Sequence, residues 1–486
     1  MSSLLDHPGW PSRIHLDSWR EGRGGVADVL EPATGQTLGT VGMASPEDVA
    51  EAAGIAARAQ TAWAAIPPEE RAAVLRRAGD LWHTHADEVT EWLVREAGSV
   101  PVKAGLEVHT ASQECYEAAA LPTHPAGDVL AGAAGRWSLA RRRPAGVVTV
   151  IAPFNFPLIL SIRSVAPALA LGNAVLLKPD PRTAVCGGVV LARIFEEAGL
   201  PAGVLQVLPG GADVGEAAVA AGPVRVVSFT GSSAAGRRVG ALGAQHLKRT
   251  HLELGGNSAL IVLPGADVHL AASAGAFGSF LHQGQICMTT GRHLVHASLY
   301  EEYLAVLSEK ASRLPVGDPT SGEVALGPLI DEGQRDRVHE IVLESVAAGA
   351  ELLTGGLYEG LFYRPTVLAD VAKTHRAWYD EVFGPVAPVR AFSEVEEAVA
   401  EAADTEYGLS LGILGDVGAA MQVADAVPSG IVHINEQTVA DEAHAPFGGI
   451  GASGTGARFG GAAANIDAFT ETQWLTVRPT IAPYPF

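Results

Sequence analysis

A repeated alternation of strand and helix patterns, beginning at Gly146, limits the folds open to this chain more than any other feature. Short apolar runs rich in β-branched residues recur at 147–153, 173–179, 204–209 and 224–231. Such continuous runs indicate strands that are buried on both faces, as in parallel sheets covered by helices. With right-handed crossovers, they predict a doubly wound, Rossmann-like α/β unit.

Helix patterns lie before and between these runs. They predict helices at 46–64, 68–97, 157–171 and 183–198. The first has the clearest start, because Ser45 is a favourable N-cap and Pro46 occupies the first helical position. The acidic residues Glu47 and Asp48 suit the positive end of that helix.

A second alternation follows Glu253. Strand patterns at 258–264 and 292–297 alternate with helix patterns near 267–281 and 299–313, and further apolar runs continue to residue 435. The pattern predicts a second α/β unit. Two segments, 122–145 and 465–486, are more polar or richer in proline and fit neither unit.

Composition narrows the class of protein. The chain has 486 residues, of which 48% are hydrophobic and 18% charged, which excludes disorder as its main state. Its net charge of −21 disfavours nucleic acid and anionic membranes as partners. No apolar run reaches the roughly 18 residues of a membrane helix, and no signal peptide is apparent. Three cysteines and no CxxC motif are typical of a reducing compartment, so we expect a cytoplasmic protein.

Three residues are candidates for catalysis. Cys287 lies in a Gly- and Thr-rich segment, HQGQICMTTGR, whose backbone amides could activate a thiolate or bind an oxyanion. Glu253 precedes Gly255 and Gly256 and could act as a general base through a water molecule. Asn155 follows a buried strand, where ligands collect, and its side-chain amide could donate to an oxyanion. Each residue taken alone is also compatible with an ordinary structural role.

Other residues are candidates for cofactor binding. The segment 229–236 follows a strand and opens a helix, and Gly231 and Ser232 lie at the turn, where amides suit a phosphate. This segment matches neither GxGxxG nor the phosphate-loop motif. Lys178 ends the strand predicted at 173–179, the next after the strand that precedes Asn155, and could bind a ribose hydroxyl or a phosphate. Glu381 could reach a ribose.

Taken together, these motifs resemble those of the NAD(P)-dependent aldehyde dehydrogenase superfamily. PFNFP, LKP, FTGS, LELGGN, GQIC, EVFGP and PFGGIGASG occur in the family's order and at its usual separations, over about residues 25 to 475. The resemblance implies that Cys287 is the nucleophile and that Asn155, with the Cys287 amide, forms the oxyanion hole. It implies that Glu253 is the base that activates water to hydrolyse a thioester. Family members that pass the acyl group to coenzyme A typically lack this base.

The resemblance also implies a cofactor-binding set and no metal. The set comprises Lys178, Gly231, Ser232, Leu254, Glu381 and Phe383. It further implies three parts: an NAD(P)-binding domain (1–121 and 146–252), a catalytic domain (253–464) and a small β oligomerisation arm (122–145 and 465–486). Such an arm adds a strand to a neighbour's sheet, so a homodimer or homotetramer is expected.

Two segments narrow the substrate, a small-molecule aldehyde. Residues 160–183 and 476–486 resemble the benzaldehyde, or aryl-aldehyde, branch, and Ile286 and Met288 beside Cys287 could line a pocket for an aromatic ring. Arg163 resembles an arginine of members that oxidise semialdehydes, so a carboxylated aliphatic aldehyde is an alternative. A non-catalytic structural relative is a further alternative, against which the presence of Cys287, Glu253 and Asn155 together argues.

The choice of cofactor depends on the residues after Lys178. NAD-preferring members often carry Glu three residues after this lysine, where Pro181 stands here. Asp180 is adjacent, and its carboxylate would repel the 2′-phosphate of NADP. We therefore expect NAD as the cofactor. Because Arg182 could reduce that repulsion, use of NADP is left open.

Overall fold

The structure of the protein is a computed structural model that describes residues 3–486. Its first sheet is parallel over five strands and continues into a short antiparallel edge. The order is β11 (Arg249–Glu253), β10 (Val224–Thr230), β7 (Val147–Ile151), β8 (Ala174–Lys178), β9 (Leu205–Val207), β1 (Ile14–His15) and β2 (Trp19–Arg20). The doubly wound α/β unit predicted from the sequence is confirmed.

Helices cover both faces of this sheet, as the continuous apolar strands require. Val148 and Val150 of β7 join one core, and Val147 and Ile151 of the same strand join the other. One face carries α1 (Pro46–Ala65), α7 (Ala212–Ala220) and α8 (Ser233–Gln245); the other carries α2 (Pro68–Thr84), α4 (Pro101–Ala120), α5 (Pro157–Ala170) and α6 (Val190–Glu197). Alternate residues of one strand therefore stabilise two separate cores.

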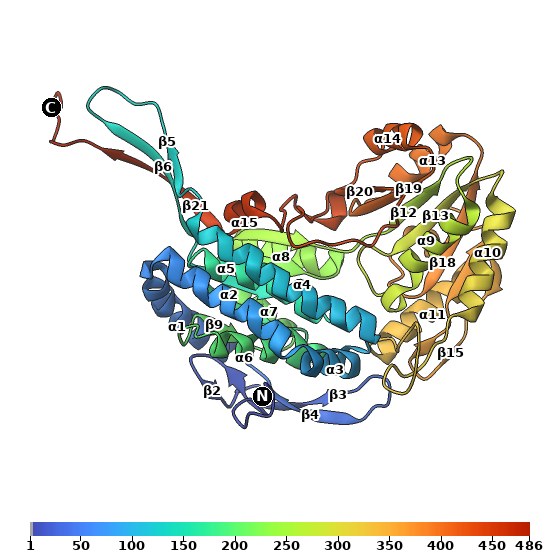
Figure 1. Ribbon diagram of the computed structural model, residues 1–486, viewed down its shortest axis with the longest axis horizontal. Coiled ribbons are helices and arrows are strands. Elements are labelled where there is room, and N and C mark those ends of the chain that lie inside the picture. The colour runs from blue at the N-terminus through green and yellow to red at the C-terminus, as the bar shows by residue number, and fades with distance from the viewer. Residues whose placement is uncertain (1–2) are drawn as a thin grey trace.

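The second α/β unit is also present. Its sheet has the order β14 (Glu351–Thr354), β17 (Thr366–Ala369), β18 (Val386–Phe392), β13 (Thr290–His296), β12 (Ser258–Val262), β19 (Ser410–Leu414) and β20 (Ile431–Ile434). All neighbours pair in parallel except β14 with β17. Helices α9 (Val268–Phe280) and α10 (Tyr300–Arg313) cover one face, and α11 (Glu332–Ala347), α12 (Arg376–Tyr379), α13 (Val395–Ala403) and α14 (Val417–Ala426) cover the other. Figure 1 shows the two units side by side.

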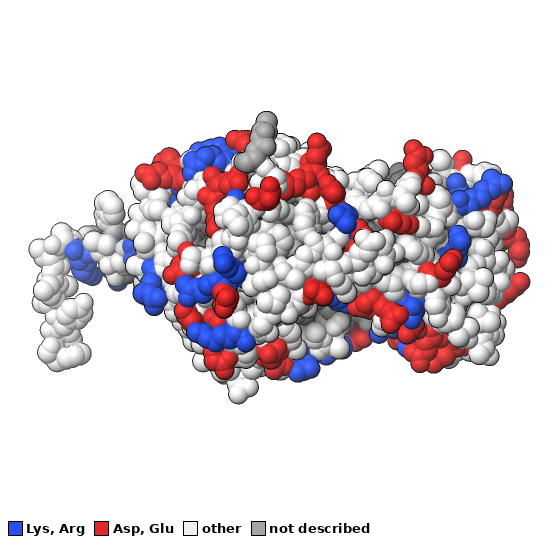
Figure 2. Space-filling view, turned by 90° about the horizontal axis from the view of Figure 1, so that it is seen from below, with Lys and Arg blue, Asp and Glu red and all other residues white. Residues whose placement is uncertain are grey.

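A small antiparallel sheet projects from the body of the molecule (Figure 1). Its strands, in the order β21 (Thr470–Val477), β6 (Trp137–Pro144) and β5 (Gly127–Val129), join the two segments that fitted neither α/β unit. Helix α15 (Ala462–Phe469) leads into β21. Val129, Trp137 and Trp474 are exposed on this sheet, and Figure 2 shows few charged side chains towards its tip.

Two helix predictions need correction. The single helix expected at 68–97 is two helices, α2 and α3 (Ala86–Ala97), because His85 leaves helical geometry and buries its ring beside Glu88 and Glu197. The helix expected at 183–198 begins with a π-helical turn, Val185–Val189, before α6. The carboxylate of Glu96 accepts hydrogen bonds from the Val185 and Cys186 amides and so holds this turn from outside.

Other local predictions are confirmed. Helix α1 begins as predicted: the Ser45 hydroxyl accepts from the Glu47 and Asp48 amides, and the Asp48 carboxylate accepts from the Ser45 amide. The remaining strands are β3 (Val26–Leu30), β4 (Thr37–Gly42), β15 (Tyr358–Glu359) and β16 (Phe362–Tyr363). Over residues 3–486 we find no helix long and apolar enough to cross a membrane.

Candidate active site

A cleft of about 1070 Å³ opens at the carboxyl ends of β7, β8 and β10 and is closed from the other side by residues of the second α/β unit. This is the edge of a doubly wound sheet at which ligands bind. The predicted site residues that line it are Asn155, Lys178, Gly231, Ser232, Leu254, Cys287, Glu381 and Phe383. Glu253, the last residue of β11, is buried and lies outside this lining. The structure therefore brings most of the predicted site residues together in one cleft, and their roles stay predictions.

Backbone geometry holds Cys287 at the cleft. The turn before it contains His282 and Gln283 with positive φ, followed by Gly284 at φ +67°. A Cβ atom at Gly256 would lie 2.4 Å from the carbonyl oxygen of Cys287, so only glycine permits this close approach. The LGGN motif thus lets the segment after Glu253 pack directly against the cysteine backbone.

Asn155 is oriented by the segment that carries the cysteine. Its side-chain nitrogen Nδ2 donates to the carbonyl oxygen of Gln285 at 2.8 Å, and the residue is 3% exposed. A primary amide has two N–H groups, so this bond leaves the second free for another acceptor. An amide fixed in this way suits the stabilisation of negative charge on a substrate oxygen.

Glu253 is a buried carboxyl group without a hydrogen-bond partner in the described structure. Its backbone oxygen accepts from the Gly231 amide at 3.0 Å, but neither Oε1 nor Oε2 has a partner. Burial raises its pKa to about 8, while the charges of Arg163 and Arg458 lower it. A carboxyl group whose pKa lies near neutral pH suits general acid–base work.

The Cys287 thiol is protonated in this state. Burial raises the pKa of Cys287 to about 12; the charges of Glu381 and Glu253 add to the effect, and Arg163 opposes it. These opposing influences show that Cys287, Glu253 and Arg163 lie within electrostatic reach of one another. A cysteine of this kind needs a proton acceptor before it can act as a nucleophile.

Glu381 and Phe383 lie beside the LGGN segment. Glu381 Oε1 accepts from the Gly256 amide at 2.9 Å, and a Cβ at Gly255 would lie 2.2 Å from Oε2. Burial raises the pKa of Glu381 to about 7. Phe383 adopts φ +55° and meets the ring of Phe154 edge-on at 5.9 Å between ring centroids. Gly255 and Gly256 therefore leave room for the close approach of both Glu381 and Cys287.

The cleft fits an anionic dinucleotide. Lys178 is 8% exposed, and its ammonium donates only to the Pro179 oxygen at 3.3 Å, so most of its hydrogen-bonding capacity is unused. Ser232 caps α8 by accepting from the Ala235 amide, at a helix N-terminus that opens into the cleft. A cation and a helix N-terminus in one cleft are the groups that bind phosphate.

Arg182 is held by three partners at the same cleft. Its guanidinium donates to both oxygens of Asp180, at 2.9 and 2.8 Å, and to Asp331 at 2.5 Å. Its carbon Cζ lies 4.3 Å from the centroid of the Phe154 ring. The charge of Asp180 is therefore largely compensated by Arg182, as the sequence suggested.

Arg163 has a partner that the sequence did not reveal. It forms an ion pair with Asp441, which lies 278 residues further along the chain, and Cζ lies 4.3 Å from the centroid of the Phe447 ring. Both Nε and Nη1 are buried without a hydrogen-bond partner. Asp441 could not be paired with Arg163 from sequence, because no local pattern connects them.

An apolar cluster adjoins the cysteine. Its buried members are Ile286, Met288, Leu409 and Phe447, and Phe156, Val439 and Cys287 itself are among the residues packed against them. Both sequence neighbours of Cys287 therefore lie in an apolar environment, but neither lines the large cleft, so their role in a pocket for an aromatic ring stays a prediction. The cluster provides an apolar wall beside the sulfur atom.

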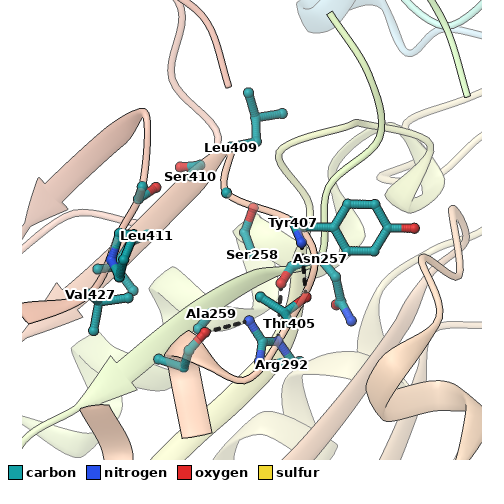
Figure 3. A pocket seen from close by; sticks show the side chains of 14 residues that line it. Asn257, Ser258, Ala259, Arg292, Thr405, Tyr407, Leu409, Ser410, Leu411 and Val427 are labelled. Atoms are coloured by element: carbon teal, nitrogen blue, oxygen red, sulfur yellow. Dashed lines mark hydrogen bonds between the residues drawn. The ribbon is translucent and has the colours of Figure 1, made fainter. Parts of the chain in front are cut away.

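A second cavity, shown in Figure 3, has a different character. It measures about 20 Å³, which is room for about one water molecule, and lies around Asn257, Arg292 and Tyr407. Arg292 donates to the carbonyl oxygens of Asn257, Glu401 and Ala402 at 2.9–3.0 Å, so its donors already have partners. This cavity belongs to the packing of the second sheet. Over residues 3–486, no cluster of side chains suits a metal ion.

The fold and the large cleft define a class: an oxidoreductase that binds NAD(P) and carries a cysteine at the cleft. The model of the aldehyde dehydrogenase family matches residues 19–475, and the chain belongs to that family. It is 65% identical over 485 residues to a vanillin dehydrogenase of Amycolatopsis sp., with 100% of both chains covered. It is 48% identical over 488 residues to an NAD(+) benzaldehyde dehydrogenase of Pseudomonas putida, again with 100% of both covered.

Solved structures agree with this assignment. A salicylaldehyde dehydrogenase from Pseudomonas putida G7, complexed with salicylaldehyde, superposes with a TM-score of 0.93 at 34% identity, covering 98% of this chain and 99% of that one. A betaine aldehyde dehydrogenase from Staphylococcus aureus in complex with NAD+ gives 0.95 at 27% identity, covering 99% and 97%. The family, its aryl-aldehyde branch and the use of NAD(P) are thereby confirmed.

Proposed function

We propose that this chain oxidises aryl aldehydes to carboxylic acids, with vanillin and benzaldehyde as the first substrates to test. The observation that carries the proposal is the apolar cluster packed against Cys287. An aromatic ring whose aldehyde carbon reaches the sulfur needs an apolar wall at this place. The names of the similar proteins, vanillin and benzaldehyde dehydrogenases, support the same substrate class.

Cys287, Asn155 and Glu253 are the residues to which we assign the chemistry. The Cys287 thiol loses its proton to a water molecule in the cleft, its sulfur adds to the aldehyde carbon, and the carbonyl oxygen becomes an oxyanion. The free N–H of Asn155 and the Cys287 amide donate to that oxyanion. The chemistry that NAD(P)+ supplies when bound is acceptance of a hydride. Loss of the aldehyde hydrogen as hydride leaves a thioester on Cys287.

Hydrolysis of the thioester is assigned to Glu253. Its carboxylate accepts a proton from a water molecule that adds to the thioester carbon. Collapse of the adduct breaks the carbon–sulfur bond and releases the carboxylic acid and the Cys287 thiolate. The pKa of about 8 leaves a usable fraction of carboxylate at neutral pH. Covalent catalysis thus divides the oxidation into two easier steps.

The paired state of Arg163 favours an aryl aldehyde over a semialdehyde. A carboxylated substrate would need an arginine whose charge is free, and here Asp441 already neutralises it. The apolar side of the guanidinium stacks on Phe447. We therefore propose that the pocket disfavours aliphatic semialdehydes.

We propose NAD as the preferred cofactor, with NADP accepted less well. Asp180 lies in the cleft near Lys178, and a carboxylate there opposes a 2′-phosphate. Its ion pair with Arg182 reduces that opposition. Cofactor contacts are assigned to Lys178, Gly231, Ser232 and Leu254 on the phosphate and adenosine side. Glu381 and Phe383 are assigned to the nicotinamide-ribose side.

The domain division, the assembly and the location are further proposals. We propose an NAD(P)-binding domain (1–121 and 146–252), a catalytic domain (253–464) and an oligomerisation arm (122–145 and 465–486). The exposed aromatic residues on the projecting sheet support a homodimer or homotetramer. Free thiols at Cys115 and Cys186 support a cytoplasmic location.

A substrate panel tests the proposed activity. Purified protein is assayed with vanillin, benzaldehyde and succinic semialdehyde, each with NAD+ and with NADP+, and kcat/KM is measured from the absorbance of the reduced cofactor. We expect the two aryl aldehydes to exceed the semialdehyde by at least about a hundredfold, the scale that a misplaced charge imposes on a pocket. A preference for the semialdehyde would overturn the aryl assignment.

Two variants test the residue roles. Cys287→Ala should abolish formation of reduced cofactor. Glu253→Gln should still give a rapid burst of about one reduced cofactor per site and then stall at the thioester, because the water lacks its base. Steady turnover by Glu253→Gln at the wild-type rate would show that another group is the base.

A further inference from the structure

A buried ion pair lies directly beneath the start of α5, next to Asn155. Lys103 and Glu107 are one turn apart on α4, and both side chains are 0% exposed. Lysine and glutamate are almost never buried this completely unless they are paired. Neither residue lines the cleft, and the reaction described above uses neither.

Lys103 uses all of its donors. Its ammonium donates to Glu107 Oε1, to the Ser99 hydroxyl at 3.0 Å and to the backbone oxygen of Asn155 at 2.7 Å. It also lies 4.2 Å from the centroid of the Phe156 ring. An ammonium group has three N–H donors, so Lys103 is fully satisfied, and one of the three partners is the residue assigned to the oxyanion.

Glu107 holds the other side of the same segment. Its Oε2 accepts from the Leu158 amide at 3.1 Å and from the Ile159 amide at 3.4 Å. These amides are in the first turn of α5, where Phe156 stands at the N-cap and provides no side-chain cap. A carboxylate from another helix therefore does the work of the missing cap and suits the positive end of the helix.

The pair and Gln285 together fix Asn155 from two directions. Lys103 holds its backbone oxygen, and the Gln285 oxygen holds its side-chain nitrogen. We propose that Lys103 and Glu107 are positioning residues that set the orientation of the Asn155 amide; this inference rests on the role assigned to Asn155 above. A shift of about 1 Å in such a donor can cost about a hundredfold in rate.

Stability alone gives no reason for an ion pair at this place. Replacing a buried pair with apolar residues of similar volume is often neutral or stabilising. What apolar residues cannot do is donate to the Asn155 oxygen and accept from two amides of α5. The pair is therefore explained by the segment it holds, residues 155–159.

A double-mutant cycle tests the proposal. We compare Lys103→Met, Asn155→Ala and the double variant by the rate constant of the initial burst of reduced cofactor. The amplitude of the burst gives the concentration of active sites, to which each rate is normalised. We expect Lys103→Met to slow the burst at least about tenfold, with KM for the aldehyde changed less than about threefold. In the Asn155→Ala variant, the further change Lys103→Met should slow the burst by less than about twofold, because the Asn155 amide that Lys103 would position is absent.

Glu96 provides a matched control. Its buried carboxylate also accepts from two backbone amides at a helix start, those of Val185 and Cys186, but at a segment without Asn155. Glu107→Gln should slow the burst per titrated site, whereas Glu96→Gln should lower the melting temperature and leave that rate unchanged. Equal slowing in both variants would mean that the effect is general loosening and would overturn the proposal.

An apolar double replacement covers the case in which single variants do not fold. Lys103→Met with Glu107→Leu removes both charges together, which a buried site tolerates better than one unpaired charge. We expect it to fold and to show a burst at least about tenfold slower. A wild-type burst in this variant would overturn the positioning role. A normal burst in Asn155→Ala alone would instead overturn the oxyanion assignment, so the two failures are distinguishable.

Discussion

Two buried ion pairs flank the reactive cysteine, and they differ in how completely their hydrogen bonds are satisfied. Lys103–Glu107 has a partner for every ammonium donor and for both carboxylate oxygens. Arg163–Asp441 leaves two guanidinium nitrogens, Nε and Nη1, without a partner. Neither pair lines the cleft, so each can act on the reaction only through the residues that it contacts or through its charge.

The difference separates positioning from electrostatics. The charge of Arg163 lowers the pKa of both Cys287 and Glu253, and that of Asp441 raises both. The main charges that act on the two pKa values do not include those of Lys103 and Glu107, whose side chains contact the backbone around Asn155. The saturated pair, Lys103–Glu107, in which every donor and acceptor has a partner, therefore positions neighbouring atoms. The unsaturated pair, Arg163–Asp441, in which two guanidinium nitrogens have no partner, acts through its electric field.

The largest effect should be on stability, from breaking the saturated pair. Glu107→Gln removes the anionic partner of the fully buried Lys103 ammonium, and removal of one partner of a buried pair costs about 3–5 kcal/mol. Asp441→Asn should cost less, because the Asp441 side chain is 20% exposed and water reaches it. Urea unfolding of both variants at one protein concentration measures the difference, and a larger loss in Asp441→Asn would reverse the comparison.

The next effect is on substrate choice, from the unsaturated pair. Asp441→Asn frees the charge of Arg163 beside the apolar cluster, and a hydrogen bond to a charged group contributes about 1.5–3 kcal/mol. The ratio of kcat/KM for succinic semialdehyde over benzaldehyde should therefore rise about ten- to a hundredfold. Glu107→Gln is the control, since it should slow both substrates and leave the ratio unchanged. An unchanged ratio in Asp441→Asn would show that Arg163 does not face the substrate.

The sequence predicted the fold because its strands are locally unambiguous. The run VVTVI is apolar except at Thr149, and the structure divides its four apolar side chains between two cores. The site motifs were equally informative, since Cys287 and Asn155 line one cleft and Glu253 is buried within electrostatic reach of the cysteine. The structure explains why glycine follows Glu253, which the spacing of the motif alone cannot do. A side chain at Gly255 would collide with Glu381, and one at Gly256 would collide with the backbone of Cys287.

The buried pairs could not be predicted, for two reasons. Lys103 and Glu107 have the spacing of an ordinary exposed helical pair, and only tertiary packing buries them. Arg163 was recognised as unusual, but its partner lies 278 residues away in a loop. The break at His85 was missed similarly, because burial of its ring between two glutamates is a tertiary effect.

A smaller effect is expected in the pH dependence of hydrolysis. Burial raises the pKa of Glu253 to about 8, and the base acts as a carboxylate, so the rate of thioester hydrolysis should rise as the pH increases through 8. Arg163→Met removes a charge that lowers this pKa, so the inflection should move to higher pH; Asp441→Asn should move it to lower pH. A shift of one pH unit corresponds to about tenfold in carboxylate fraction below the inflection.

The same measurement separates the two pairs. Lys103→Met should slow the reaction at every pH and leave the inflection in place, because the main influences on the pKa of Glu253 are its burial and the charges of Arg163, Arg458 and Asp441. Single-turnover hydrolysis of the preformed thioester, followed from pH 6 to 10, gives the inflection for each variant. An inflection that moves in Lys103→Met would mean that the saturated pair also acts through its field.

The smallest effect is expected where the same helical spacing occurs on the surface. Glu309 and Arg313 of α10 are four residues apart, like Lys103 and Glu107, but their side chains are 55% and 77% exposed. Exposed pairs of this kind contribute about 0.3–0.5 kcal/mol. Arg313→Met should therefore leave the burst rate unchanged and barely move the urea midpoint. The spacing and the charge types match those of Lys103–Glu107. A large loss of stability or of burst rate in Arg313→Met would therefore mean that burial does not distinguish Lys103–Glu107 from the surface pair. The contrast would then depend only on the hydrogen-bond partners of Lys103 and Glu107.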